Sequence, residues 1–363
     1  MSPENIFDKI LKCQKDSKGV SIYPNGIWKP FNGAPNFEYC NWLHYNLNRA
    51  FHDNNLDLKI KNLYFYFIHH DGINACADNT NPPYNFIGVT KGLVDYVTFL
   101  FCNIVRHENF LPDIFEINLA EESIIIYNET FFSWQKFCTD NSLKKYEPEG
   151  YFPSNSKRLI ISKGLILNFI FFIIMHEIGH LNQKSRSLFF EFDNLPNEEK
   201  ENLSNQTLEM DADKYAVNQL AEQLINSYKN LSKEGNTQVF FENKRNLVRY
   251  AIFILFVMFY LFSVEIKFEK YTLKYPHPHP SMRFNYSVTL LLDYFVNKSF
   301  LNNAEREELG KQSIKDFASI MQKIFPNSEI TMYFNLIKDK DLGIHHEALQ
   351  NFAKTMNNLN GNY

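Results

Sequence analysis

Two histidines flank a glutamate in the segment HEIGH, which places His176, Glu177 and His180 within five residues. Residues four apart lie on the same face of an α-helix, so both imidazoles can reach a single metal ion. Glu177 directly follows the first histidine, which puts its carboxylate beside the metal without making it a ligand. From there it can take a proton from a zinc-bound water whose pKa the ion has lowered. The pattern therefore predicts a catalytic zinc site with its own general base.

A catalytic zinc ion needs three protein ligands and an open position, and acidic residues downstream offer the third ligand. The segment EMDAD carries Glu209, Asp211 and Asp213, with residues 181–208 between it and the second histidine. Glu209 and Asp213 are four apart and share one helix face, whereas Asp211 points elsewhere. We expect Glu209 to ligate zinc and Asp213 to accept the outer N–H of a ligand histidine. A solvated acidic face is the alternative interpretation of this segment.

Helices and strands must position these residues. The apolar run before HEIGH predicts a helix over 163–184, and apolar spacing of three and four predicts another over 207–228, with Thr207 as a candidate N-cap. The intervening charged segment, 191–206, is expected to be an exposed connection. Upstream we expect strands at 63–68 and 85–90, a loop at 71–84 and a helix at 91–107.

The segment YPHPHPSMR, residues 275–283, is predicted to be a rigid loop because its prolines restrict the backbone. It carries His277, His279 and Arg283. The fixed fork of an arginine suits pairing with a carboxylate or with a developing oxyanion. A structural turn with a surface arginine is the alternative.

HExxH followed by ExxxD on a second helix resembles the gluzincin zinc peptidases. INACADN…NFIGVTKGLVDYV and HPHPSMR are similar to segments of the HtpX and CAAX-prenyl-endopeptidase lineage and of the phage-exclusion Lit peptidases. Those families carry a His-Pro with an arginine six residues after the histidine. His277 and Arg283 match that spacing, with His279 as a substitute. The resemblance implies a zinc endopeptidase, with His277 and Arg283 near the transition-state oxyanion or the ligand-bearing carboxylate.

The expected fold is α+β and predominantly helical, with a minigluzincin-like zinc peptidase core and a small sheet, as the resemblance implies. We expect an N-terminal extension over 1–60, a core over 61–290 and a helical C-terminal region over 291–363. Residues 108–157 look like an insertion relative to the HtpX-like pattern. The long transmembrane helices of that branch also have no counterpart, which moves the chain closer to the Lit-type peptidases.

The composition indicates which binding partners and which cellular compartment to expect. The 363 residues are 45% hydrophobic and 21% charged, and the formal net charge is -4. A globular protein is expected, and nothing points to a nucleic-acid partner, which usually needs a basic face. The five cysteines are widely spaced without a CxxC motif, as expected for free thiols in a reducing cytoplasm. The N-terminal segment has no apolar signal region.

Two apolar runs bear on membrane association. Residues 164–175 and 250–264 hold twelve and fifteen residues without a charge, which falls short of the roughly 18–20 of a span. We expect both to be buried core helices, with membrane association through 250–264 as the alternative.

The predicted function is that of a zinc-dependent endopeptidase acting on an intracellular protein, possible roles being phage defence or a stress response. The alternatives are a regulatory peptidase that cleaves one partner and a non-catalytic protein that keeps zinc for stability. The oligomeric state is left open.

Overall fold

In the computed structural model the chain forms two compact units, Met1–Asn182 and Gln183–Tyr363. The fold is α+β and predominantly helical, which confirms the predicted class. The structure describes residues 21–23, 42–43, 45–47, 63–69, 74–78, 85–106, 152–184, 197–233, 244–263, 277–278 and 280–324.

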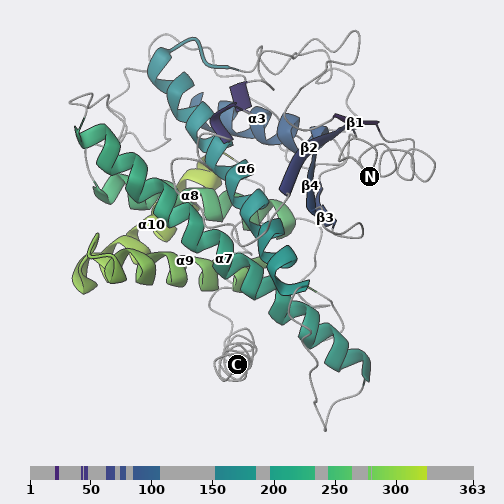
Figure 1. Ribbon diagram of the computed structural model, residues 1–363. Helices are drawn as coiled ribbons and strands as arrows, with labels where there is room; N and C mark the ends of the chain where they lie inside the picture. Colours follow the sequence, from purple (N-terminus) through teal and green to yellow (C-terminus); the bar gives the residue numbers. More distant parts are fainter. Residues whose placement is uncertain are drawn as a thin grey trace. The chain divides into compact units, whose positions relative to one another are not determined.

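The first unit contains a four-stranded sheet with the order β1-β2-β4-β3 (Figure 1). Its strands are β1 (Ser21–Tyr23), β2 (Leu63–His69), β3 (Ala75–Asp78) and β4 (Asn85–Thr90). β2 and β4 are parallel, and the two outer strands pair antiparallel with their neighbours. The two predicted strands are therefore confirmed. A third, β3, lies in the segment expected to be a loop, and β1 comes from the predicted N-terminal extension.

The centre of the sheet leads directly into a helix. Residues 86–90 of β4 are all buried, as expected for a strand paired on both sides. Thr90 ends the strand and caps α3 (Lys91–Arg106), since its hydroxyl accepts from the backbone N–H of Leu93 at 3.4 Å. The same hydroxyl exchanges hydrogen bonds of 2.9 Å with the backbone of Asn74, just before β3. One threonine thus joins three elements of the unit.

The long helix α6 (Ser156–Lys184) carries HEIGH. It begins seven residues before the predicted start because Asn155 caps it, accepting from the backbone N–H groups of Lys157 and Arg158 at 3.0 and 3.2 Å. The buried Arg158 guanidinium donates to the carbonyl of Val105 at 2.8 Å, near the C-terminal end of α3. The unit boundary after Asn182 falls inside this continuous helix.

The second unit is built from α7 (Asn197–Lys233), α8 (Lys244–Ser263), α9 (Pro280–Asn297) and α10 (Asn303–Ile324) (Figure 1). α9 packs against the other three helices. The predicted connection 191–206 is wrong in its second half, because α7 already begins at Asn197. Thr207 is accordingly no N-cap: it lies inside α7 and is buried.

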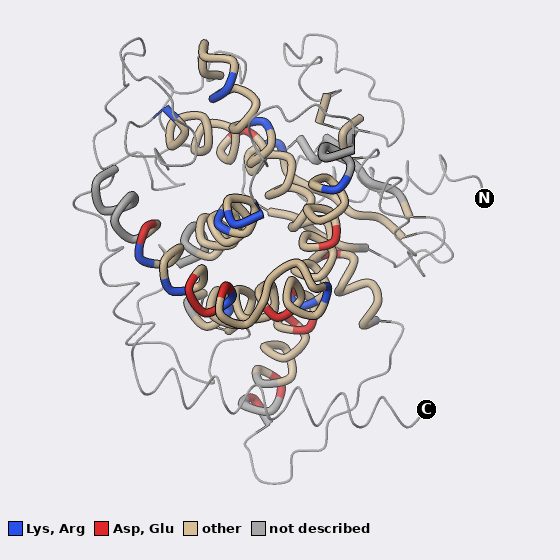
Figure 2. The backbone as a smooth tube through the Cα atoms, turned by 90° about the vertical axis from the view of Figure 1, so that its left-hand side faces the viewer, with Lys and Arg blue, Asp and Glu red and all other residues tan. Residues whose placement is uncertain are grey.

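α10 is fixed to α8 by charges and by aromatic rings. The Phe317 ring is fully buried, with its centroid 5.0 Å from that of Phe253 and 6.2 Å from that of Phe256. Figure 2 marks the acidic and basic residues along the described helices, where both signs occur. Three ion pairs join the two helices: Lys244–Glu305, Arg245–Glu308 and Arg249–Asp316.

The segment expected to be a rigid loop over 275–283 becomes helical at Pro280, which starts α9. Proline suits the first helical position, where its missing N–H costs nothing. Arg283 therefore lies in the first turn of a helix, not in a loop. The helix ends at Asn297, and two residues later Ser299 has a left-handed φ of 56°. The N–H of Phe300 donates back to the carbonyl of Phe295 at 2.8 Å.

One described helix, Ser156–Gln183, is long and apolar enough to cross a membrane, and 72% of its most apolar stretch is buried. The run 164–175, which we judged too short to cross, is thus part of a longer apolar helix. Length and composition are weak grounds for a span, since the core helix of a soluble protein meets them too. α8, which holds most of the run 250–264, does not meet the same criterion.

Candidate metal centre

The two histidines of HEIGH converge at their Nε2 atoms, which lie 3.0 Å apart. Their rings are nearly perpendicular, at 89°, with centroids 4.6 Å apart. Two nitrogens bound to one tetrahedral zinc at about 2.0–2.1 Å are separated by about 3.3 Å. His176 is buried and His180 is half-buried. The local geometry of α6 is therefore close to that of a pair of ligands on one ion.

The acidic residues of α7 are held by an arginine of α9. Arg283 donates through Nε and one terminal nitrogen to the two oxygens of Asp213, both at 2.7 Å. The same terminal nitrogen lies 3.3 Å from Oε2 of Glu209. Asp213 is fully buried, and the side chains of Arg283 and Glu209 are only 11% and 14% exposed. A two-pronged contact of this kind fixes both partners, and so limits how far Glu209 can move.

The structure places His277 beside the same carboxylate. Its Nδ1 lies 3.4 Å from Oε1 of Glu209, and its side chain is 62% exposed. His279, the alternative active-site histidine, lies outside the described residues. Of the two roles implied for His277 and Arg283, proximity to the predicted ligand carboxylate is thus seen. A role at an oxyanion stays a prediction.

Asp213 was predicted to accept the outer N–H of a ligand histidine. Both of its oxygens accept from the Arg283 guanidinium, a partner 70 residues away that the helical spacing of α7 could not indicate. The histidine contact stays a prediction. Asp211, expected to point elsewhere, accepts a hydrogen bond of 3.1 Å from Gln183.

Phe259 of α8 completes the surroundings of Arg283. The guanidinium carbon lies 5.3 Å from the centroid of this fully buried ring, within the range of a cation–π interaction. Nothing in the sequence singles out Phe259, since it is one of many apolar residues in α8.

Negative charge around this cluster also affects a tyrosine. Tyr286 follows Arg283 by three residues on α9. Burial raises the pKa of its hydroxyl above the ordinary value of 10.0, and the carboxylates of Asp211 and Asp213 raise it further. The phenol therefore stays protonated at neutral pH.

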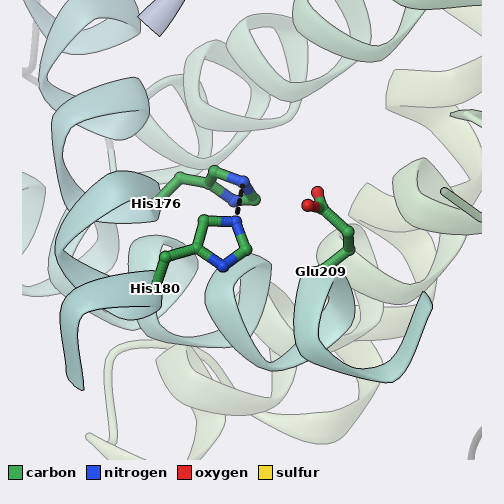
Figure 3. A group of neighbouring side chains, drawn as sticks. All are labelled: His176, His180 and Glu209. Carbon is green, nitrogen blue, oxygen red and sulfur yellow. Dashed lines mark hydrogen bonds between the residues drawn. The ribbon is translucent and has the colours of Figure 1, made fainter. Parts of the chain in front are cut away.

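His176, His180 and Glu209 form a group that could hold a metal ion, with one ligand atom from each residue and all three atoms within 4.8 Å of one another (Figure 3). These are the three predicted ligands. Two imidazole nitrogens and one carboxylate oxygen match the donors of three-ligand catalytic zinc sites. Iron(II) also accepts this donor set, so the three residues could hold a metal ion without indicating which one.

Glu177, the predicted base, follows His176 on α6 and is half-buried. It is not one of the three residues of the metal group. Its position agrees with a carboxylate beside the ion, and its catalytic role stays a prediction.

Comparison with known proteins supports a peptidase. The sequence pattern of the family Peptidase U49 matches residues 119–292, a stretch that includes HEIGH, the acidic residues of α7 and Arg283. No curated protein and no solved structure matches the chain. The match supports a peptidase, a hydrolase with a protein or peptide as substrate. It begins inside the segment 108–157, so most of the predicted insertion belongs to the pattern of this family.

Proposed function

We propose that this protein is a zinc-dependent endopeptidase that cleaves an intracellular protein. The observation that carries the proposal is the group of His176, His180 and Glu209 within the stretch matched by a peptidase family. Zinc is favoured over iron(II) because a hydrolase needs a Lewis acid without redox chemistry, and because HExxH supplies a base next to the ligands.

The residues of this chain divide the chemical work. A bound zinc ion would polarise the scissile carbonyl and lower the pKa of a water molecule. Glu177 takes a proton from the attacking water as the new C–O bond forms, and then delivers that proton to the leaving amine as the peptide C–N bond breaks. Arg283 and His277 hold the Glu209 carboxylate in place. The Arg283 charge is already bound to Asp213, which favours positioning over direct contact with the substrate.

The strand at 85–90 is a poor candidate for pairing with an extended substrate, because β4 is already paired with β2 on one side and with β3 on the other. Within the described sheet β3 is an outer strand, and its outer edge is the proposed place for a strand of substrate backbone.

The test compares cells that make the wild type with cells that make Glu177→Gln, by a proteome-wide search for new N-termini. We expect substrate-derived N-termini with the wild type and a loss of cleavage of about 100- to 10,000-fold in the variant, at unchanged zinc content. Glu201→Gln, an exposed change on α7, is the matched control and should cleave like the wild type.

Three outcomes decide between the proposal and its alternatives. Purified protein without zinc, or cleavage by Glu177→Gln equal to the wild type, contradicts the proposed mechanism. Bound zinc with no cleaved substrate favours a zinc-stabilised interaction protein. A single cleaved partner points to a regulatory peptidase, whereas induction of cleavage by phage infection or stress supports a defence role. Cell fractionation tests the proposed cytoplasmic location.

A further inference from the structure

Gln183, near the C-terminal end of α6, makes two hydrogen bonds to α7. Its Nε2 atom donates to the backbone carbonyl of Leu208 at 2.7 Å and to Oδ2 of Asp211 at 3.1 Å. The side chain is buried, with 6% exposure. Both partners are acceptors, so the orientation of the amide is fixed: the nitrogen must face α7.

The carbonyl that Gln183 contacts belongs to the residue directly before Glu209. Inside a helix a carbonyl ordinarily accepts from the N–H four residues later, and its second lone pair remains open for another donor. Gln183 uses that capacity. It therefore holds the backbone of α7 at the position from which the Glu209 side chain extends.

The spacing along α6 connects this contact to the histidines. Gln183 follows His176 by seven residues and His180 by three, so all three side chains lie on one helix face. A continuous helix has a fixed rise of about 1.5 Å per residue, which sets the distance from His180 to Gln183 at about 4.5 Å along the axis. A hydrogen bond at Gln183 thus constrains where the preceding turn of α6, with the imidazole of His180, can lie.

We propose that Gln183 is a positioning residue, which sets the distance between the histidine ligands and Glu209 through the backbone of Leu208. This inference rests on the proposed metal site. It assigns no contact between Gln183 and the metal or the substrate.

The test measures the zinc affinity of the full-length protein by competition with a chromophoric chelator. Gln183→Met keeps the length of the side chain and removes the donor, and Gln183→Asn keeps the amide but shortens the reach by one methylene. We expect each variant to bind zinc about 10-fold more weakly, the lower end of the effect of residues that support metal ligands.

Gln312→Met is the matched control. Gln312 donates to Asp316 at 2.7 Å, so the same amide–carboxylate bond is lost, but within the exposed surface of α10. It should bind zinc like the wild type. The absorption of the cobalt(II)-substituted protein gives a second readout, since a displaced ligand changes the d–d bands, whereas a general loss of stability leaves the folded fraction's spectrum unaltered.

The outcomes separate the two claims. If the wild type binds no zinc, the proposed function fails. If the wild type binds zinc and the folded Gln183 variants bind it equally well with unchanged cobalt spectra, the positioning role is overturned and the metal site stands. Should Gln183→Met not fold, the result with Gln183→Asn decides.

Discussion

The two sources of metal ligands are built in different ways. α6 supplies two histidines whose Nε2 atoms converge through helical spacing alone, on a helix whose residues 169–176 are all buried. α7 supplies one carboxylate, and that side chain lies against His277, which precedes α9, and Arg283 of α9, 68 and 74 residues further along the chain. The histidine side is thus positioned by local structure and burial, whereas the carboxylate side is positioned by a tertiary network.

Because of this difference, some substitutions should weaken metal binding alone, and others should also destabilise the fold. A histidine ligand can be removed without leaving a buried charge behind. Removal of Arg283 would leave the charge of Asp213 buried without this partner, because Asp213 is fully buried. Buried charges without a partner are costly, often more so than the loss of the ion pair itself.

The largest effect on metal binding is expected from His180→Ala. The change removes one of three ligands, so the zinc affinity should fall by more than about 100-fold, beyond the effect of outer partners. The free energy of unfolding of the metal-free protein should change by less than about 1 kcal/mol, because His180 is only half-buried. Chelator competition and urea denaturation measure the two quantities. A large loss of stability without metal would contradict the contrast between the two sides.

Arg283→Met should break the carboxylate side and the fold together. It removes the two bonds of 2.7 Å to Asp213 and the contact with Glu209, at a cost of about 3–5 kcal/mol in the free energy of unfolding. Urea denaturation of the metal-free protein tests this value. Exposed Arg245, which pairs with Glu308, is the matched control, and Arg245→Met should cost less than about 1 kcal/mol.

Two substitutions on α8, Phe259→Leu and Phe253→Leu, compare a ring that contacts Arg283 with a ring that contacts Phe317. Phe259→Leu removes the aromatic face beneath Arg283 and should cost about 1–2 kcal/mol of stability. Phe253→Leu, at another fully buried ring of the same helix, should cost a similar amount. Only the change at Phe259 should also weaken zinc binding, because only that ring is stacked on the arginine. Equal zinc affinities of the two variants would remove Phe259 from the network.

The last two effects are expected only at alkaline pH, where one titratable group in each unit changes its charge. Burial raises the pKa of the Cys102 thiol from 9.0 to about 12, against smaller lowering effects of Ser162, Arg106 and Lys163. The folded state therefore holds this proton more tightly than the unfolded state. The resulting stability is fully present below about pH 9 and is lost as the pH rises toward about 12.

Cys102→Ala should flatten the decline of the free energy of unfolding across this range, as followed by urea denaturation at several pH values. Tyr286→Phe should do the same for the second unit, above the ordinary tyrosine pKa of 10.0, since its folded pKa is also raised. An unchanged slope in either variant would show that the group titrates alike in the folded and unfolded states.

The parts predicted correctly from the sequence are those that depend on local periodicity. The apolar run before His176 predicts the helix that carries HEIGH, and β2 and β4 follow from their aromatic and branched residues. The helical spacing within HEIGH and EMDAD also led to His176, His180 and Glu209, the three residues that could hold a metal ion. These features require no knowledge of which segments meet in space.

The remainder depends on contacts between distant segments. The pairing of Arg283 with Asp213 spans 70 residues, and Gln183 reaches Leu208 across 25. The short strand β3 was missed because its residues Ala75–Asp78 have weak strand propensity, and only pairing with β4 stabilises it. The start of α9 was missed because prolines favour loops in sequence, although the first turn of a helix accepts them equally well.

The attachment of α10 has a consequence for shortened versions of the protein. The family match ends at residue 292, inside α9, and α10 lies wholly beyond it. A chain cut at the end of the match would expose the rings of Phe253 and Phe256, which now face Phe317, and would leave Lys244, Arg245 and Arg249 without their carboxylates on α10. Such a fragment should aggregate, so the smallest soluble catalytic fragment should extend to about residue 324, where α10 ends.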